Sequence, residues 1–405
     1  MARSKPTLAV VSPFIDKRHG TERRVAEWTS RLTRDYEVHV YSQRVEDLDL
    51  GSLTWHRIPR IPGPHLANFL WWLAANHLWR WWDRRFRGVH HDLVFTAGTN
   101  CLDADAISIH IVFAEFVRQV RPELSFKRNS IASWPRLIHR RLYYRLVRAL
   151  ERRLYLHPRA QLILIASKTQ EDLDRYYGAH EPLPVVYMGI DHSAFSVETR
   201  IARREEARRE LKIPADRFVF LLVGNDWRKK GLFTLLDAMP LLADLQIMLL
   251  VAGSDETHSY HKPIRESQLE DRVCFLPSRA DVGFYYAAAD AYVGPSLEDT
   301  FAQPPAEAMA CGLPVITTVT NGTAEIMTDR VDGILLRDPT DARSLAVAMR
   351  SLCLDAGLCR NLGENAARTA REYTWDANAE QFRQIFARIL SRKENSSAAA
   401  IRQES

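Results

Sequence analysis

The chain has 405 residues, which is more than one hydrophobic core commonly supports, and its composition of 46% hydrophobic and 26% charged residues is that of a globular protein. Five scattered cysteines without a CxxC pair exclude a disulfide framework and a cysteine zinc site, and they indicate a reducing compartment. The net charge of +5 divides into +10 for residues 1–190 and −5 for residues 191–405, which indicates two domains with different partners unless the helix surfaces differ by chance.

Short aliphatic runs alternate with longer amphipathic stretches, and the runs fall into two successive sets. Runs this short and apolar are typical of parallel strands covered on both faces, and the alternation predicts βαβ units. The first run ends at Pro13 without a small-residue cleavage site, so it is interpreted as a strand and not as a signal peptide. The predicted strands are 8–12, 37–42, 92–98, 106–112 and 162–167, followed by 218–224, 247–253, 273–277, 291–296, 314–318 and 333–336.

The predicted organisation is α/β, with two doubly wound Rossmann-like domains facing across a cleft. The boundary falls near 182–195, where prolines interrupt the pattern, and a charged helix follows at 201–213. The expected domains are 1–190 and 191–375. A helix at 376–392, able to pack back on the first domain, and a polar disordered tail at 393–405 follow them.

Ligands of such sheets bind beyond the carboxyl ends of the strands, so the side chains that bind them are expected in the loops there. Arg228, Lys229 and Lys230 stand between a strand and a helix start. Cations at a helix N-terminus oppose the helix dipole unless an anion is bound there, and a diphosphate would be such an anion. The alternative is a solvated basic loop.

A second loop, 295–303, leads into a helix that prolines open and that Cys311 and Gly312 close. Asp299 and Glu307 can face one pocket and would suit hydrogen bonds to the vicinal hydroxyls of a sugar or ribose. The alternative is that Glu307 only satisfies the helix start, where it is placed in the first turn. Free backbone N–H groups near Ala302 and Gln303 would suit phosphate.

Further candidates lie at other strand ends. Residues 320–327 add a third loop with Gly322 and Glu325. In the first domain, Gly20 in the loop 13–28 leads into a helix and would suit an anion or a sugar. Asp103, Asp105 and His110 lie near a strand end, and Asp103 and Asp105 are candidates on the acceptor side. A lone histidine is usually structural, but the strand beside His110 should point at the cleft.

The chain resembles the retaining glycosyltransferases of family 4 (group 1) with the GT-B fold, over residues 7 to 392. Its carriers are HGTERRVAE (19–27), HDLVFTAG (91–98), LLVGNDWRKKGLFTLLDAM (221–239), YAAADAYVGPSLEDTFAQPPAEAMACGLPVITT (286–318) and the closing YTWDANAEQF (373–382).

The resemblance implies that the second domain binds a UDP- or GDP-linked sugar and that the first binds an acceptor. It assigns the diphosphate to Lys230 with Arg228 or Lys229, the ribose to Glu307 and the transferred sugar to Asp299, for which the adjacent Glu298 can compete. Phe301 and Ala302 match the segment whose backbone lies against sugar and phosphate. Ala302 replaces the usual glycine, which restricts backbone approach to the donor. Gly20 and Thr21 match the loop near the donor phosphates, and His110 matches a histidine near the sugar ring, so the predicted catalytic residues are Asp299, His110 and Lys230.

The implied reaction is the transfer of a glucose- or mannose-type hexose to a hydroxyl of a glycan or lipid-linked acceptor, with retention, in cell-surface polysaccharide or glycolipid assembly. Cations and helix starts aimed at the leaving diphosphate would stabilise its charge. No DxD motif is placed after a strand to hold a metal, and the DAD at 103–105 matches that pattern only trivially. We therefore expect no metal and no cofactor.

Two alternatives stay open: a GT-B-like sugar-nucleotide epimerase, and a non-catalytic protein that binds a sugar nucleotide or a nucleic acid. RNA binding would place aromatic side chains among arginines on an exposed sheet. The arginine-rich stretch 136–155 has helical spacing instead, so no nucleic-acid partner is expected.

Five of the ten tryptophans lie between residues 71 and 82, in the stretch FLWWLAANHLWRWWDRRFRG (69–88). The stretch is too short and polar to span a bilayer, and at 100° per residue it forms an amphipathic helix. Trp71, Trp72, Trp79 and Trp82 fall on one face with Ala75 and Phe86, whereas Asn76, His77 and Arg80 fall on the other. A packing helix is the simpler interpretation, but Trp beside Arg also suits a membrane interface. The chain is therefore expected in the cytoplasm, attached to an anionic membrane face through Trp71, Trp72, Trp79, Trp82, Arg84 and Arg85.

Overall fold

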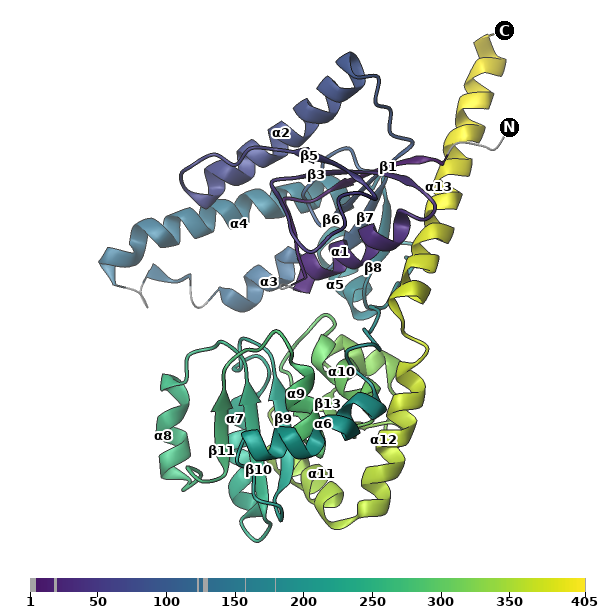
Figure 1. The fold of residues 1–405 in the computed structure, drawn as a ribbon. Helices are drawn as coiled ribbons and strands as arrows, with labels where there is room; N and C mark the ends of the chain where they lie inside the picture. The colour runs from purple at the N-terminus through teal and green to yellow at the C-terminus, as the bar shows by residue number, and fades with distance from the viewer. Residues whose placement is uncertain are drawn as a thin grey trace. The chain divides into compact units, whose positions relative to one another are not determined.

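The computed structural model describes residues 5–17, 20–121, 124–126, 130–156, 158–178 and 180–404, and for residues 131 and 397–404 it describes the backbone alone. The chain forms two compact units (Figure 1). Unit 1 comprises Met1–Tyr187 with Asn378–Ser405, and unit 2 comprises Met188–Ala377.

Unit 1 is built on a six-stranded parallel sheet with the order β5-β3-β1-β6-β7-β8. The inner strands are almost fully buried, as expected for aliphatic runs covered by helices on both faces. The strands are β1 Thr7–Val11, β3 Glu37–Ser42, β5 Thr54–Arg57, β6 Leu93–Ala97, β7 Ala106–Ile109 and β8 Gln161–Leu164, and the pair β2 Phe14–Ile15 and β4 Arg44–Val45 lies apart from them.

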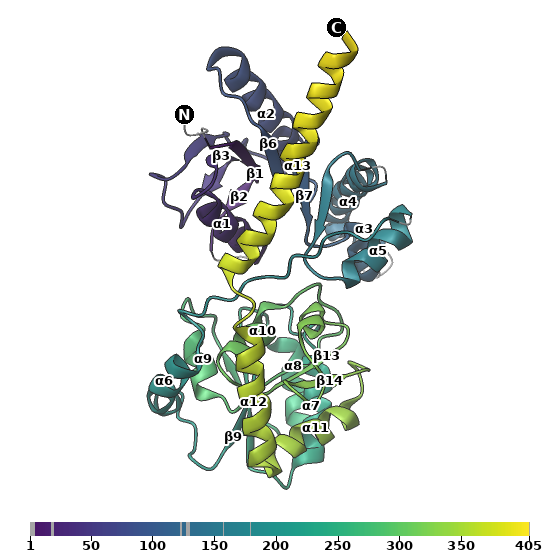
Figure 2. The ribbon, with the colours of Figure 1, turned by 90° about the vertical axis from the view of Figure 1, so that its right-hand side faces the viewer.

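The helices of unit 1 pack on the two faces of this sheet. Trp28 of α1 lies 4.6 Å from Phe382 of α13 between ring centroids, and Phe95 of β6 lies 5.3 Å from Phe386, so the last helix shares the core of unit 1 (Figure 2). The helices are α1 Gly20–Leu32, α2 His65–Phe86, α3 Phe113–Val120, η2 Ile131–Ser133, α4 Trp134–Tyr155, α5 Lys168–Tyr177 and α13 Trp375–Glu404.

Unit 2 repeats the same architecture with the strand order β11-β10-β9-β12-β13-β14, again all parallel. Numbered within each unit, both orders are 3-2-1-4-5-6, that of the doubly wound dinucleotide-binding fold. The strands are β9 Phe218–Val223, β10 Ile247–Ala252, β11 Val273–Leu276, β12 Ala291–Gly294, β13 Val315–Thr318 and β14 Ile334–Leu336. The helices are α6 Val197–Glu210, α7 Leu232–Ala238, η3 Met239–Leu242, α8 His258–Glu266, α9 Gly283–Ala288, α10 Gln303–Ala310, η4 Gly322–Ile326, α11 Ala342–Leu354 and α12 Ala356–Ala370.

Every run predicted as a strand forms one, but the edge strand β5, the short pair β2 and β4, the end of α13 and the orientation of α2 differ from the sequence prediction. The edge strand β5 was not predicted, because its sequence TWHR has no aliphatic run. As an edge strand it pairs with β3 alone. The tail predicted to be disordered from residue 393 continues α13 to Glu404. Extending an existing helix needs no new nucleus, and the three alanines at 398–400 have high helix propensity.

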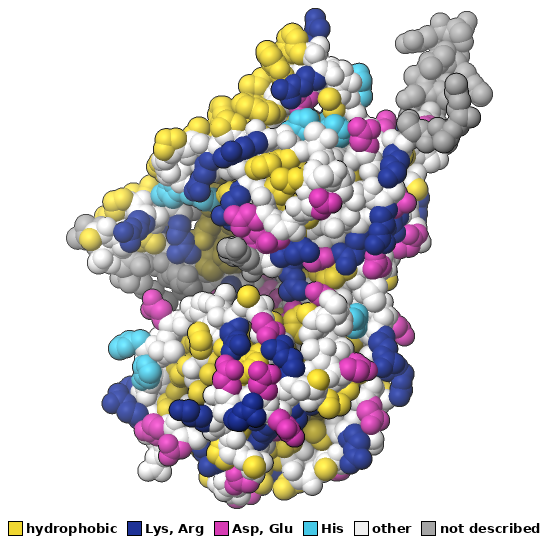
Figure 3. Space-filling view, in the orientation of Figure 1, with side chains coloured by type: hydrophobic (Ala, Val, Ile, Leu, Met, Phe, Trp, Pro, Cys, Tyr) yellow, Lys and Arg dark blue, Asp and Glu magenta, His cyan; other side chains and the backbone are white. Residues whose placement is uncertain are grey.

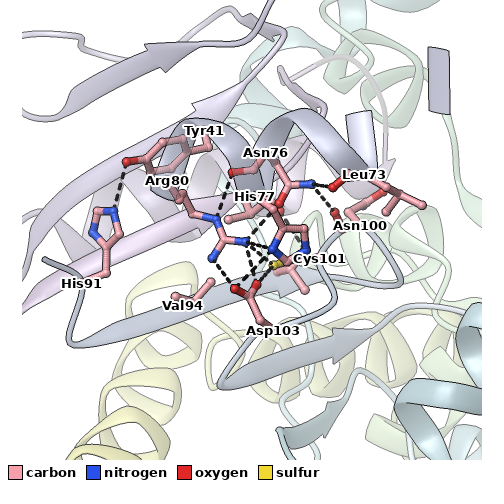
Figure 4. A network of polar contacts seen from close by, with 12 residues as sticks. Tyr41, Leu73, Asn76, His77, Arg80, His91, Val94, Asn100, Cys101 and Asp103 are labelled. Atoms are coloured by element: carbon pink, nitrogen blue, oxygen red, sulfur yellow. Dashed lines mark hydrogen bonds and ion pairs between the residues drawn. The ribbon is translucent and has the colours of Figure 1, made fainter. Parts of the chain in front are cut away.

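The helix α2 is rotated by about a quarter of a turn from the predicted orientation. Asn76 and Arg80, predicted to face solvent, are buried, whereas Trp82 and Phe86, predicted to pack, are 50% and 57% exposed. The buried polar groups find partners, which offsets the cost of their burial (Figure 4). Arg80 donates to both oxygens of Asp103, at 2.6 and 3.2 Å, and Asn76 Nδ2 donates to the carbonyl of Trp72 at 2.8 Å.

A second buried group holds the end of the same helix. Asp83 accepts a hydrogen bond from Tyr41 at 2.8 Å, lies 2.6 Å from Nδ1 of His56, and pairs with Arg87 at 3.1 Å. Tyr41 also lies 3.0 Å from His91 (Figure 4). Burial, before all other causes, lowers the pKa of His91 to about 4. These contacts tie α2 to the strands β3 and β5 through polar groups.

Candidate functional site

The main candidate site lies at the carboxyl ends of β9 and β12 in unit 2. These strands are neighbours in the middle of the sheet. After β9 the chain continues to β10 on one side, and after β12 it continues to β13 on the other side. Ligands of doubly wound sheets bind at this switch point. The loop 224–231 follows β9, and the loop 295–302 follows β12.

A glycine brings the two loops together. Gly231 has φ +82°, and a Cβ atom there would lie 2.1 Å from the carbonyl oxygen of Pro295. The backbone N–H of Leu297 donates to the carbonyl of Lys229 at 2.8 Å. Only glycine allows this approach, and it places the side chain of the preceding residue against the β12 loop.

That side chain is Lys230, whose Nζ lies 2.5 Å from Oδ2 of Asp299. The two side chains are 13% and 25% exposed, so both are accessible to a ligand. The other two predicted cations differ: Lys229 pairs loosely with Asp226 at 3.7 Å, and Arg228 is exposed. The structure therefore brings together one predicted cation and one predicted carboxylate of the donor site, with Glu298 beside them half-buried.

Asn321, which the sequence analysis did not single out, organises the loop that carries Asp299. It is fully buried, and its Oδ1 accepts from the backbone N–H groups of Ala302 at 3.3 Å and of Thr323 at 3.1 Å. The backbone of Asp299 donates to the carbonyl of Thr320 at 3.3 Å, and its carbonyl accepts from Gly322 at 2.9 Å. An Asn-Gly pair in the loop that follows β13 was the available signal.

Glu307 is buried at 5% exposure and lies in α10 as its fifth residue. This corrects the prediction that Glu307 occupies the first turn, and it also counts against the alternative that Glu307 only satisfies the helix start. Tyr286 donates to Oε2 of Glu307 at 3.0 Å, and burial followed by the charge of Glu307 raises the pKa of Tyr286 well above its ordinary value. Burial, followed by the charges of Asp299 and Glu307, also raises the pKa of Tyr292. The charges of Asp299 and Glu307 thus both act on the Tyr292 hydroxyl.

The start of α10 is less open than predicted. The N–H of Ala302 was expected to be free for phosphate, but it donates to Asn321. The side chain of Gln303 donates to the carbonyl of Gly189 at 3.4 Å, and Phe301 is buried. Prolines occupy the next two positions of the helix and have no N–H to offer.

In unit 1, two of the predicted residues meet at the carboxyl edge of the sheet. Gly20 opens α1, and Oγ1 of Thr21 lies 3.3 Å from Nδ1 of His110, which follows β7. His110 is buried, and its Nε2 lies 3.2 Å from the hydroxyl of Ser108. Burial and then the charge of Arg24 lower the pKa of His110 well below its ordinary value, so its ring is neutral at pH 7.

Asp103 and Asp105 do not join this group, which corrects the expectation that they lie on the acceptor side with His110. Both precede β7 and therefore lie at its amino end, whereas His110 follows its carboxyl end. Asp103 is paired with Arg80, and Asp105 accepts from the backbone N–H of Val94 at 2.8 Å and pairs with Lys393 at 2.6 Å. Both carboxylates hold the fold together.

The membrane-surface candidates divide in the same way. Trp72 is 1% exposed and donates from Nε1 to the carbonyl of Asn100 at 3.1 Å, so it belongs to the core. Trp71 and Trp79 are half-buried and meet edge to face at 6.3 Å. Trp82, Arg84 and Arg85 are exposed.

Within the described part of the chain, one group of side chains is close enough to share a metal ion: His77, Cys101 and Asp103, whose ligand atoms lie within 4.8 Å. The guanidinium of Arg80 donates to Asp103 and lies 3.4 Å from Sγ of Cys101 (Figure 4). A cation thus already neutralises these ligands, and the group does not fit a metal.

Two family models match the chain, one in each half. Glycosyltransferase Family 4 matches residues 18–194, and Glycosyl transferases group 1 matches residues 203–369. D-inositol 3-phosphate glycosyltransferase of Xylanimonas cellulosilytica is 30% identical over 246 residues, which cover 57% of this chain and 58% of that protein. The enzyme of the same name from Streptomyces bingchenggensis is 29% identical over 247 residues, which cover 57% and 53%. The chain spans just over half the length of these curated relatives.

Solved structures match over almost the whole chain. WaaG, a glycosyltransferase involved in lipopolysaccharide biosynthesis, has a TM-score of 0.72 at 21% identity and covers 93% of this chain and 99% of its own. Sucrose-phosphate synthase from Thermosynechococcus elongatus has a TM-score of 0.72 at 20% identity, covering 96% and 100%. Anabaena HepE, in complex with UDP and glucose, has a TM-score of 0.68 at 18% identity, covering 94% and 99%. At these identities the likeness shows the fold, and it confirms the predicted α/β GT-B class. The chain belongs to the group 1 glycosyltransferases of family 4.

Proposed function

We propose that the chain transfers a hexose from a nucleoside-diphosphate sugar to an acceptor hydroxyl. The observation that carries the proposal is the Lys230–Asp299 pair, 2.5 Å apart and accessible, at the switch point of unit 2, where the helix that follows β12 also carries the buried Glu307. A cation and carboxylates in one place suit a ligand that combines phosphates with hydroxyl groups. Family membership supports this proposal.

In the proposed reaction, Lys230 with Arg228 or Lys229 holds the diphosphate, Glu307 accepts from the ribose hydroxyls, and Asp299 contacts the sugar. The bond between the anomeric carbon and the phosphate oxygen breaks, and the bond from the acceptor oxygen to that carbon forms on the same face. The configuration is retained because the new bond forms on the face that the phosphate leaves, and the donor phosphate takes the acceptor proton. The cations stabilise the charge that develops on the leaving group, and the proposal needs neither a metal nor a cofactor.

The contribution of unit 1 stays a prediction, with Gly20 and Thr21 near the donor phosphates and His110 near the sugar ring. The proposed acceptor is a hydroxyl of a glycan or a lipid-linked glycan, in cell-surface polysaccharide or glycolipid assembly. The proposed place of work is the cytoplasm, at the inner face of the membrane. Because the curated relatives are named for D-inositol 3-phosphate, this polyol phosphate is the second acceptor to test.

The first experiment measures thermal stabilisation by UDP-, GDP- and ADP-linked hexoses, and then turnover with and without acceptors. We expect one nucleotide series to raise the Tm of the wild-type chain and to lose at least tenfold in affinity in Glu307→Gln. The matched control is Glu266→Gln, because Glu266 is 65% exposed on α8 and should leave affinity unchanged.

The same assay separates the alternatives. An epimerase would convert the sugar without transferring it, and a non-catalytic binder would show stabilisation without turnover. If no nucleotide sugar stabilises the chain, the donor site is wrong.

A further inference from the structure

The outer face of α2 is apolar, although two charged side chains of the same helix, Arg80 and Asp83, are buried. We call Leu70, Leu78, Trp81, Trp82 and Phe86 the outer α2 stripe; these side chains are 48%, 50%, 55%, 50% and 57% exposed. Figure 3 shows hydrophobic side chains along the outer edge of α2, with Lys and Arg side chains beside them. Large aromatic side chains that gather on a surface mark an interaction site.

The polar contacts under α2 hold this face outward. If burial of apolar surface alone set the rotation of α2, the tryptophans of the stripe would face the sheet and Arg80 would face water. Instead Arg80 is 7% exposed and Asp83 is 1% exposed, and each is fixed by partners from other elements. Buried ion pairs contribute little net stability, so their effect here is to fix the orientation of the helix.

The charge around the stripe is positive. Arg84, Arg85 and Arg87 are exposed beside it, and the helix contains one acidic residue, the buried Asp83. The helix α4 packs against the first half of α2, with the Phe69 and Tyr143 rings 5.3 Å apart. It has the same composition: seven arginines, one acidic residue that is buried, and the exposed apolar side chains Trp134, Ile138 and Leu142.

We propose that the outer α2 stripe docks on a lipid bilayer that contains anionic lipids. Tryptophan and arginine side chains suit the boundary between headgroups and acyl chains, where the ring enters and the cation stays with phosphate. A groove of about 470 Å³, lined by Leu78, Trp79, Trp81, Trp82, Asp83 and Arg87, gives an acyl chain a place between the rings. None of the helices in the described residues is both apolar and long enough to cross a bilayer.

A second copy of the chain is a poorer occupant of this surface. Self-pairing of the stripe would bring two arginine-rich faces together without a carboxylate to meet them, because Asp83 and Glu151 are buried. Like charges placed face to face oppose association. An anionic bilayer supplies the missing negative charge.

The test is co-sedimentation of the full chain with vesicles of phosphatidylcholine alone, and of phosphatidylcholine with phosphatidylglycerol, without a nucleotide sugar. We expect binding to the anionic vesicles, and at least a tenfold loss for Trp81→Ser/Trp82→Ser/Phe86→Ser. The matched control is Val347→Ser/Leu354→Ser, which removes two side chains that are 69% and 66% exposed in unit 2 and should change nothing. Arg84→Ser/Arg85→Ser should weaken binding severalfold, unlike Arg209→Ser, which removes an exposed charge of α6.

Two outcomes would overturn the proposal: equal binding or equal non-binding to both vesicle types, and loss of self-association, instead of vesicle binding, in the stripe variant. The result does not depend on the proposed activity, because stabilisation by a nucleotide sugar is measured separately and should survive in every α2 variant. Loss of vesicle binding with retained donor binding therefore tests the surface, and loss of donor binding alone tests the enzyme.

Discussion

The donor edge of unit 2 and the α2 layer of unit 1 distribute charge in opposite ways. At the donor edge, Lys230 and Asp299 meet where solvent still reaches them, at 13% and 25% exposure. In the α2 layer, Arg80 and Asp83 are enclosed, whereas Trp81 and Trp82 lie outside. Both regions contain a lysine or arginine paired with an aspartate, so the pair by itself does not identify a site.

The difference lies in what surrounds each pair. A glycine and three backbone hydrogen bonds position the loops at the donor edge, so Lys230 and Asp299 can exchange each other for a ligand. In the α2 layer the charged groups themselves hold the helix in position, and Arg80 and Asp83 each have two or more partners. Both members of the donor-edge pair reach solvent and can meet a ligand, whereas Asp83 and His56, whose side chains are 2% and 6% exposed, fix the position of a neighbouring surface.

The largest expected effect comes from breaking an enclosed pair. Asp83→Asn removes the buried carboxylate that accepts from Tyr41 and lies 2.6 Å from His56, and loss of a charged hydrogen-bond partner inside the fold costs about 3 kcal/mol. The free energy of unfolding, from urea denaturation followed by tryptophan fluorescence, should fall by that amount. Arg85→Ser, on the exposed side of the same helix, should stay within about 0.5 kcal/mol. Equal effects of the two changes would contradict the distinction.

The next effect concerns the accessible pair. Lys230→Ala should lower turnover by about 10²–10³-fold with little change in unfolding free energy, because a preorganised group aimed at a leaving anion contributes that much. Arg228→Ala should lower turnover less than about tenfold, since its side chain is exposed and not fixed. Steady-state transfer assays with the donor found by thermal stabilisation measure both. A stability loss in Lys230→Ala as large as its loss of activity would make the pair structural.

The sequence predicted the fold because each buried strand shows its burial locally, as a run of aliphatic residues. It predicted the donor loops because parallel strands end at one edge, and this rule brings Lys230 and Asp299 together across 69 positions. The rotation of α2 was not predictable from a helical wheel, which counts the hydropathy of each side chain and not its partner. Arg80 can be buried because it pairs with Asp103, and Asp83 can be buried because it accepts from Tyr41. These partners lie 23 and 42 positions away in the sequence, so a helical wheel of α2 does not include them.

The role of Asn321 escaped for a related reason. Its side chain acts on backbone groups of its own and the preceding loop, and a backbone N–H carries no signature in the sequence. The prediction placed Asp103 and Asp105 with His110 because all three are close to one short strand in the sequence. The aspartates precede β7 and His110 follows it, so they lie at opposite edges of the sheet.

A smaller effect appears as a pH dependence of unit 1. Glu151 accepts from the N–H groups of Phe113 and Ala114 and from Tyr177, but burial dominates and raises its pKa to about 7. Because this pKa exceeds the unfolded value of about 4.3, the folded state holds the proton more tightly, and stability falls as pH rises from about 4.5 to 7. The wild-type chain should therefore lose on the order of 2 kcal/mol relative to Glu151→Gln across this window, at about 1.4 kcal/mol per pKa unit.

The measurement is the unfolding free energy of both chains at several pH values. Taking the difference between them removes other titrating groups, including His91, whose lowered pKa gives the opposite slope. A difference that stays constant with pH would mean that Glu151 is ionised in the folded chain throughout this range.

The smallest expected effect is on the stripe itself. Trp82→Ser should change the free energy of unfolding by no more than about 0.5 kcal/mol in solution, because half of the side chain already contacts water. Trp72→Ser, ten positions earlier on the same helix, should cost about 3–5 kcal/mol, because that side chain is 1% exposed and its removal leaves a cavity. If Trp82 proved as costly as Trp72, the stripe would be part of the core. A near-zero cost would instead show that Trp82 does not stabilise the free chain, as expected for a side chain that serves to bind a partner.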